Sequence, residues 1–141
     1  MKIIRLMLLS VFLLASGVAT AADDPVKVVY HLTNGTGEAT RALRNIRNHL
    51  NADPTAKIVV VANGLGIDFL LNDAKAENGS KFTAPIGELS NRGVEFRVCA
   101  NTLETREIAQ DRVVMEATIV PSGVAEAARL QAREKFVYLR P

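Results

Sequence analysis

The sequence lacks most of the features that identify a function directly. After residue 22 it has no apolar run long enough to cross a bilayer, no run of basic residues and a single cysteine, Cys99. One cysteine excludes an internal disulfide and leaves intermolecular pairing, a reactive role or plain burial as the roles of this thiol. The absence of basic runs argues against binding to nucleic acid or to an anionic membrane.

Motifs for common cofactors and reactions are missing as well. Gly64-Leu65-Gly66 lacks the third glycine of a dinucleotide-binding loop, and Gly35-Thr36-Gly37 lacks the Gly-Lys-Ser/Thr of a phosphate-binding loop. No Gly-x-Ser-x-Gly elbow supports serine hydrolase chemistry. No histidines or cysteines are paired at metal-ligand spacing. We therefore expect no cofactor and no metal, and tight turns explain both glycine loops at least as well as phosphate binding does.

The N-terminus has the pattern of a secretory signal peptide. Lys2 and Arg5 precede an apolar run over residues 6–18, and Ala19-Thr20-Ala21 is the small-x-small pattern that signal peptidase recognises. We expect cleavage after Ala21, which makes residues 22–141 a periplasmic domain without a membrane anchor. The alternative is an uncleaved anchor, because residues 6–22 are at the short limit for a bilayer of roughly 30 Å. No cysteine follows the run, so a lipoprotein anchor is excluded.

The expected mature domain carries no net charge. Of the 17 basic residues, Lys2 and Arg5 belong to the leader, which leaves 15 against the 15 acidic residues. The remaining 120 residues suit one domain with one core.

Strand-like and helix-like segments alternate along this domain. Runs rich in β-branched residues predict strands over 26–32, 57–62, 94–99, 118–120 and 136–139. Helical spacing or capping residues predict helices over 39–52, 67–71, 85–89, 101–110 and 123–134. In the last helix Val124, Ala127, Ala128 and Leu130 are the expected inward positions. Such alternation predicts βαβ units, and so an α/β domain with helices on both faces of a mainly parallel, five-stranded sheet.

Three polar features follow strands of this sheet. They are His31 with the loop 33–38, the turn 63–66, and Cys99 with Asn101. Because ligands of open parallel sheets bind beyond the carboxyl ends of the strands, this shared edge is the expected site.

Cys99 is the strongest candidate in that site. It precedes Asn101, which we interpret as a helix N-cap with Glu104 three residues later. Unpaired N–H groups at such a helix start favour an anion, and the thiolate is the reactive form of cysteine. The alternative is a small, buried and inert residue at a strand end.

The two histidines have different expected roles. His31 could orient a ligand or act as a base towards Cys99, or it could be a hydrogen-bonded residue at a strand end. His49 lies off the apolar stripe of its helix, so we expect it to face solvent.

Several segments resemble the DsrE/DsrF-like family. They are Tyr30-His31-Leu32-Thr33-Asn34-Gly35, residues 42–50, Val98-Cys99-Ala100-Asn101-Thr102-Leu103, Val120-Pro121-Ser122-Gly123-Val124 and Arg129-Leu130-Gln131. The likeness covers about residues 26–141 and is closest to the small exported branch of that family.

The resemblance implies a flavodoxin-like α/β/α sandwich that assembles into trimers or hexamers. It also implies a sulfur carrier, because family members that act in sulfur oxidation and transfer-RNA thiolation hold a persulfide on a cysteine that closes a strand. Cys99 occupies the matching place, while export argues against the thiolation role.

Three hypotheses follow for the function. The first is a periplasmic sulfur-handling protein in which Cys99 holds a persulfide, Asn101 stabilises the anion and His31 assists proton transfer, with a sulfur donor or acceptor protein as partner. The second is a non-enzymatic, oligomeric module that binds a small ligand or partner, with Cys99 structural. The third and weaker one is a redox sensor that forms an intermolecular disulfide.

Overall fold

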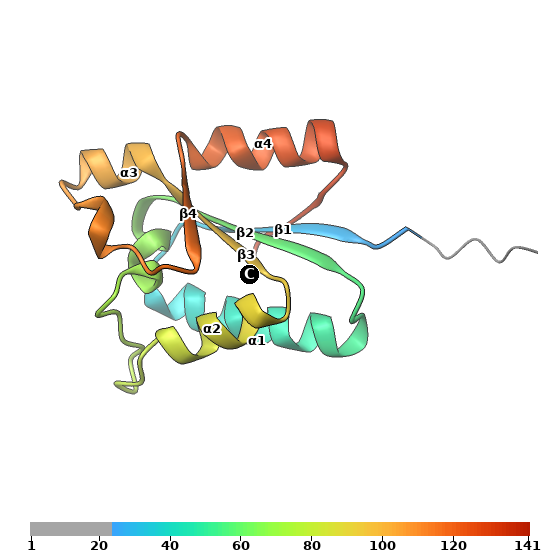
Figure 1. Cartoon of the computed structure of the whole chain (residues 1–141), viewed down its shortest axis with the longest axis horizontal. Helices are drawn as coiled ribbons and strands as arrows, with labels where there is room; N and C mark the ends of the chain where they lie inside the picture. The colour runs from blue at the N-terminus through green and yellow to red at the C-terminus, as the bar shows by residue number, and fades with distance from the viewer. Residues whose placement is uncertain (1–23) are drawn as a thin grey trace, which may run out of the picture.

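The computed structural model describes residues 24–141, so the expected leader over residues 1–21 lies outside the described residues. Within residues 24–141, five strands alternate with helices (Figure 1). In order they are β1 (Lys27–Leu32), α1 (Thr36–Ala52), β2 (Lys57–Ala62), the 3-10 helix η1 (Gly64–Leu70), α2 (Thr83–Asn91), β3 (Glu95–Cys99), α3 (Ala100–Thr105), the 3-10 turn η2 (Gln110–Arg112), β4 (Ala117–Val120), α4 (Gly123–Glu134) and β5 (Val137–Leu139). Between residues 24 and 141, no helix is both long enough and apolar enough to cross a membrane.

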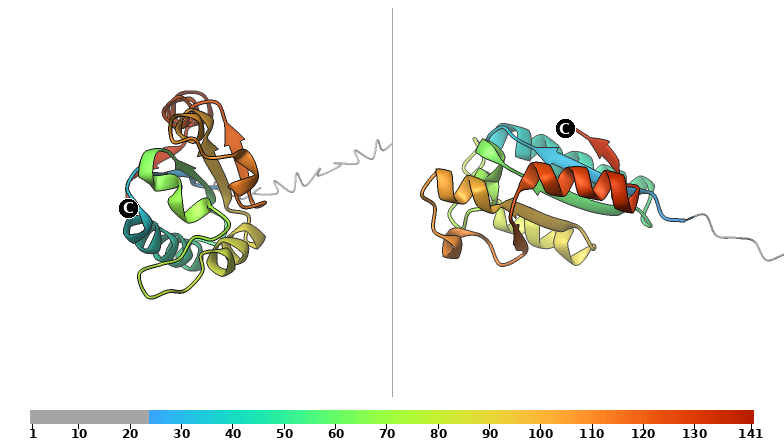
Figure 2. Two further views of the ribbon diagram at one scale, coloured as in Figure 1. Left: turned by 90° about the vertical axis from the view of Figure 1, so that its left-hand side faces the viewer. Right: turned by 90° about the horizontal axis from the view of Figure 1, so that it is seen from above.

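The strands form one sheet in the order β4-β3-β2-β1-β5, and every pairing is parallel. Helices α1 and α2 cover one face, and α3 and α4 cover the other (Figures 1 and 2). The expected three-layer α/β/α architecture is therefore confirmed. Leu32 pairs with Ala62, Ala62 with Val98 and Cys99 with Val120, so four strands end at the same edge.

The larger core lies between the sheet and α1 with α2. Helix α1 buries Ala39, Ala42, Leu43, Ile46 and Leu50, the apolar stripe that its sequence predicted. Strand residues two apart, such as Val28, Tyr30 and Leu32, meet it from the sheet because alternate side chains of a strand share a face.

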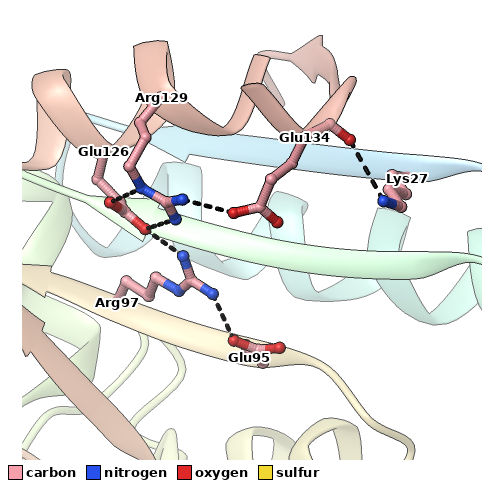
Figure 3. Close-up of polar contacts among 6 residues, drawn as sticks. All are labelled: Lys27, Glu95, Arg97, Glu126, Arg129 and Glu134. Carbon is pink, nitrogen blue, oxygen red and sulfur yellow. Dashed lines mark hydrogen bonds and ion pairs between the residues drawn. The ribbon is translucent and has the colours of Figure 1, made fainter. Parts of the chain in front are cut away.

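The face beneath α4 has a smaller apolar core and a network of charges. The apolar part consists of Val29, Val59, Val61, Ala127, Leu130 and Phe136. Beside it, Arg97 of β3 pairs with Glu126 of α4, and Arg129 binds the same carboxylate through Nε at 2.9 Å and Nη2 at 2.8 Å (Figure 3). Glu95 and Glu134 extend the network at its two ends. Charged groups thus hold α4 to the sheet where apolar contact is scarce.

Three helices begin two or three residues earlier than the sequence predicted, and α3 begins one residue earlier, at Ala100. Helix α1 starts at Thr36 and not at 39, because the Glu38 carboxylate accepts the N–H groups of Thr33 and Asn34 at 2.8 and 2.7 Å and closes the preceding loop within a few residues. Most of the expected turn 63–66 and helix 67–71 forms one 3-10 helix, η1, with Asn63 and Leu71 as its flanking caps. Helix α2 starts at Thr83 because Pro85 fits its first turn, where no backbone N–H is needed.

Helix α3 is shorter than predicted and ends at Thr105. Glu107 adopts a left-handed conformation with φ of 53°, Ile108 N–H donates to Leu103 O, and Glu107 N–H donates to Glu104 O. This is the Schellman pattern, which glycine usually marks in a sequence. Because a glutamate takes that position here, the sequence signal for the end was missing.

Two of the four inward positions predicted for α4 are wrong. Ala127 and Leu130 are buried, whereas Val124 is 59% exposed and Ala128 is also exposed. The helix meets the sheet along Gly123, Ala127 and Leu130, a narrow stripe at spacings of four and three.

Candidate functional site

Cys99 is the last residue of β3 and the N-cap of α3. It is the only cysteine of the sequence, and its side chain faces the layer that contains α4. Only 4% of the residue is exposed. The thiol is therefore placed at the carboxyl edge of the sheet, as expected, but beneath the surface.

Gly123 at the start of α4 covers the thiol. A β-carbon on Gly123 would lie 3.2 Å from Cys99 Cβ and 3.1 Å from Asn63 Cβ, tighter than ordinary side-chain contact. The absence of a side chain at this position lets the first turn of α4 approach both residues. Asn63, which follows β2, thus stands beside Cys99 in the same small space.

Hydrogen bonds lower the pKa of the Cys99 thiol in spite of its burial. Burial disfavours the charged form and raises the pKa. It is outweighed by hydrogen bonds from the Thr102 hydroxyl and from the backbone N–H groups of Gly123, Thr102 and Asn101. The first turns of α3 and α4 supply these N–H groups, which have no partner within their own helices. The site therefore favours a thiolate.

Thr102 links this site to the neighbouring loop. Its Oγ1 accepts the Gly64 N–H at 3.0 Å. A hydroxyl that accepts in this way keeps its own O–H free to donate, here to the sulfur. Thr102 thus adds a donor that the backbone alone does not provide.

Replacement of Thr102 by valine is expected to raise the pKa of Cys99 and slow its alkylation. A hydrogen bond contributes about 1 kcal/mol, so we expect the rate at neutral pH to fall about fivefold. The rate of reaction with iodoacetamide as a function of pH measures this. Thr105→Val is the matched control, because the exposed Thr105 hydroxyl donates to Asn101 O one turn away. Equal pH profiles for both variants would contradict the role of Thr102.

His31 lies at the same edge, but its hydrogen bonds do not reach Cys99. Nε2 is 2.6 Å from Asn63 Oδ1, and Nδ1 is 2.9 Å from the Tyr138 hydroxyl. The residue is 8% exposed and packs edge-on against the Tyr138 ring. Asn63 therefore stands between His31 and Cys99.

Asn101 does not begin α3, so its predicted role as N-cap is wrong. Cys99 takes that position and Asn101 is the second residue of the helix, with an exposed side chain. Its backbone N–H donates towards the sulfur and also reaches Pro121 O at 3.3 Å. Two residues that bind the sulfur, Thr102 and Gly123, were not predicted from the sequence. Thr102 stands three residues after the true cap, a spacing that could have identified it.

His49 is also placed differently from its prediction. It is partly buried on α1, where Nδ1 is 3.0 Å from the Tyr30 hydroxyl. Burial raises the pKa of Tyr30, which keeps that hydroxyl protonated and able to donate. The pair joins α1 to β1.

The two glycine loops act as turns. In the first, the amides of Thr33 and Asn34 are already bound to Glu38. In the second, the Gly64 N–H binds Thr102. These groups are therefore not available to a phosphate. Across residues 24–141, no three His, Cys, Asp or Glu side chains gather in a way that could hold a metal ion.

Comparisons with known proteins agree with this fold. Residues 27–137 match the DsrE/DsrF-like family. The structure of MTH1491 from Methanobacterium thermoautotrophicum, a protein of unknown function, is 28% identical with a TM-score of 0.74 and covers 82% of this chain and 99% of its own. The ychN protein from E. coli shares the fold at 13% identity, with a TM-score of 0.62 and the same coverages. No curated protein matches significantly. The chain belongs to the DsrE/DsrF-like family.

Proposed function

We propose that this protein is a periplasmic sulfur carrier that holds a persulfide on Cys99. The observation that carries the proposal is the set of donors around the sulfur, from Thr102, Asn101 and Gly123, which lowers the pKa of the thiol. The family is associated with sulfur relay in general, which supports the same chemistry.

The transfer needs no oxidant. The Cys99 thiolate attacks the outer sulfur of a donor persulfide, R–S–SH, so that a new S–S bond forms while the donor S–S bond breaks. The donor leaves as R–S⁻ with the electron pair, and Cys99 becomes a persulfide. An acceptor nucleophile then takes the outer sulfur, and the Cys99 thiolate is restored. The donors that stabilise the thiolate also stabilise it as the leaving group of the second step.

We also propose that the domain is exported, with cleavage after Ala21, and that it works as a homo-oligomer, a trimer or hexamer, with a sulfur donor or acceptor protein. The leader pattern supports export. Exposed apolar residues support assembly: Val137, Tyr138 and Leu139 of the edge strand β5, and Val124 of α4. Tyr138 also binds His31, so an interface there would extend to the site.

The burial of Cys99 favours a second candidate function. Since only 4% of Cys99 is exposed and Gly123 covers it, the thiol could fill space in a non-enzymatic module that binds a ligand or partner. In that case Cys99→Ser leaves stability, assembly and ligand binding nearly unchanged. Sulfur transfer in contrast requires that a donor reach the sulfur, so the first turn of α4 would have to move.

The intact mass of the protein before and after exposure to polysulfide tests the first proposal. We expect an increase of about 32 Da, or multiples of it, that reductant removes. Cys99→Ser is the matched control and should gain nothing. An unmodified native protein whose thiol also resists alkylation would reject the carrier function and leave the binding module.

A further inference from the structure

A cleft of about 580 Å³ runs between α1 and residues 76–85. Figure 1 shows α1 on the face of the sheet opposite α4, whereas Cys99 lies beneath the start of α4. Sites for small molecules usually enclose roughly 300–1,000 Å³. The cleft is thus large enough for a ligand and separate from the thiol site.

The wall opposite α1 is an ordered hairpin. Lys75 and Lys81 pair as an antiparallel bridge, and Ala76 N–H donates to Ser80 O at 2.9 Å. Phe82, which follows the hairpin, is 3% exposed and packs edge-on against Phe69 in the core. These contacts hold the wall opposite α1 in place.

The rim of the cleft is cationic. Arg41, Arg44 and Arg47 line it from one face of α1, and Lys81 lines it from the hairpin. Like charges three residues apart destabilise a helix. Glu88 offsets the charge of Arg47 through bonds of 2.9 and 3.2 Å to its Nε.

The other three cations have no such partner. Among residues 24–141, none of Arg41, Arg44 and Lys81 forms an ion pair. Within the described residues, Glu77 is the one carboxylate that lines the cleft. The sequence after the leader is neutral as a whole, so this excess of positive charge is local to the cleft.

The floor of the cleft is apolar. Leu43 and Phe82 form its buried base, each 3% exposed, and Ala76 and Pro85, which are partly exposed, line it beside them. We propose that this cleft binds a small organic anion with an apolar body. Its acid group contacts Arg41, Arg44 and Lys81, and its body packs against Ala76 and Pro85. Guanidinium groups bind carboxylates and sulfonates through paired hydrogen bonds, and the apolar floor selects against inorganic anions.

Two probes with the same tail and opposite charge test the proposal. Hexane-1-sulfonate and hexyltrimethylammonium are each titrated into the ¹⁵N-labelled protein, and amide shifts are followed. We expect the sulfonate to shift the backbone amide signals of residues 37–47 and 76–84 in a saturable way, and the ammonium to leave them unchanged. Sulfate has no apolar tail, so it tests whether the apolar lining contributes to binding. It should bind more weakly than hexane-1-sulfonate.

Substitutions of charged residues in the lining should change the affinity for hexane-1-sulfonate in opposite directions. Arg41→Gln with Arg44→Gln should weaken hexane-1-sulfonate binding by about tenfold or more, since two charged hydrogen-bond donors are lost. Glu77→Gln should strengthen it, because a like charge is removed from the lining. Arg133→Gln is the control, because Arg133 is also exposed but lies on α4, across the sheet.

Other outcomes overturn the proposal. Equal binding of the two hexyl probes would make the site merely apolar, and equal binding of sulfate would make it an inorganic anion site. Binding of a glutamate-rich peptide without hexane-1-sulfonate would assign the cleft to a protein partner. The persulfide test on Cys99 is unaffected by any of these, because none of the variants touches the thiol site.

Discussion

Gly66→Ala is expected to lower the free energy of unfolding by about 3 kcal/mol or more, the upper range for overpacking of a filled site. A β-carbon on Gly66 would lie 2.2 Å from Leu32 O, 2.4 Å from Leu32 C and 2.7 Å from Thr33 N. All three atoms are backbone at the end of β1, so no side chain can rotate away. Either β1 or η1 must shift. Thermal or urea unfolding measures the loss.

The matched control for this change has the opposite sign. Gly87 lies inside α2, and the nearest atom to a β-carbon there would be Glu116 Oε1 at 3.9 Å. Gly87→Ala should therefore stabilise the protein by about 0.5–1 kcal/mol through helix propensity. Equal stabilities of the two variants would show that the backbone at Leu32 yields readily.

The consequence of Gly66→Ala should reach the site as well. Gly66 N–H donates to Asn63 O, and Gly64 of the same 3-10 helix binds Thr102. A displaced η1 would weaken the hydrogen bond that orients the Thr102 hydroxyl towards the sulfur. The Cys99 thiol of this variant should thus react as it does in Thr102→Val.

The strands could be predicted because their signal is local. Parallel strands buried on both faces have near-continuous apolar runs, and residues 57–62 matched β2 to the residue. The end of α3 was not predicted because Glu107, and not a glycine, takes the left-handed position that terminates the helix. The start of α1 was also missed, because the Glu38 carboxylate binds the backbone of the preceding loop and allows that loop to be short.

The candidate site was predicted in position but not in composition. Cys99 was identified because it ends a strand, which is visible in the sequence. Gly123 lies beside it only because β4 and the start of α4 return to the same edge, a contact between distant segments. The partners of His31 were missed for the same reason, since Asn63 follows β2 and Tyr138 lies in β5.

Glu126→Gln is expected to cost about 3 kcal/mol at neutral pH, in the range for loss of one partner of a buried ion pair. The Glu126 carboxylate binds Arg97 from the sheet and Arg129 from its own helix (Figure 3). Its side chain is 12% exposed, so water replaces little of the lost interaction. Glutamine keeps the shape but leaves the two guanidinium groups without their shared negative charge. Urea unfolding of both proteins measures the difference.

At acid pH the native protein and Glu126→Gln should have nearly the same free energy of unfolding. Hydrogen bonds from Arg129 and Arg97 lower the pKa of Glu126 in the folded protein below its ordinary value, although burial opposes them. A carboxylate with a lowered folded pKa contributes fully above its unfolded pKa, about 4.3, and the contribution is lost as pH falls through the folded value. The native protein should therefore lose its advantage over Glu126→Gln progressively below about pH 4.

Glu134→Gln separates the shared carboxylate from ordinary surface charge. Glu134 pairs with Arg129 at 2.5 Å, but its side chain is 41% exposed and it does not bind Arg97. Exposed pairs of this kind contribute about 1 kcal/mol or less, so this variant should remain close to native at every pH. If Glu126→Gln and Glu134→Gln cost the same, the network is only a solvated surface cluster. A larger cost for Glu126→Gln, lost in acid, would instead mean that one carboxylate holds α4 over the sheet, where the apolar contacts are few.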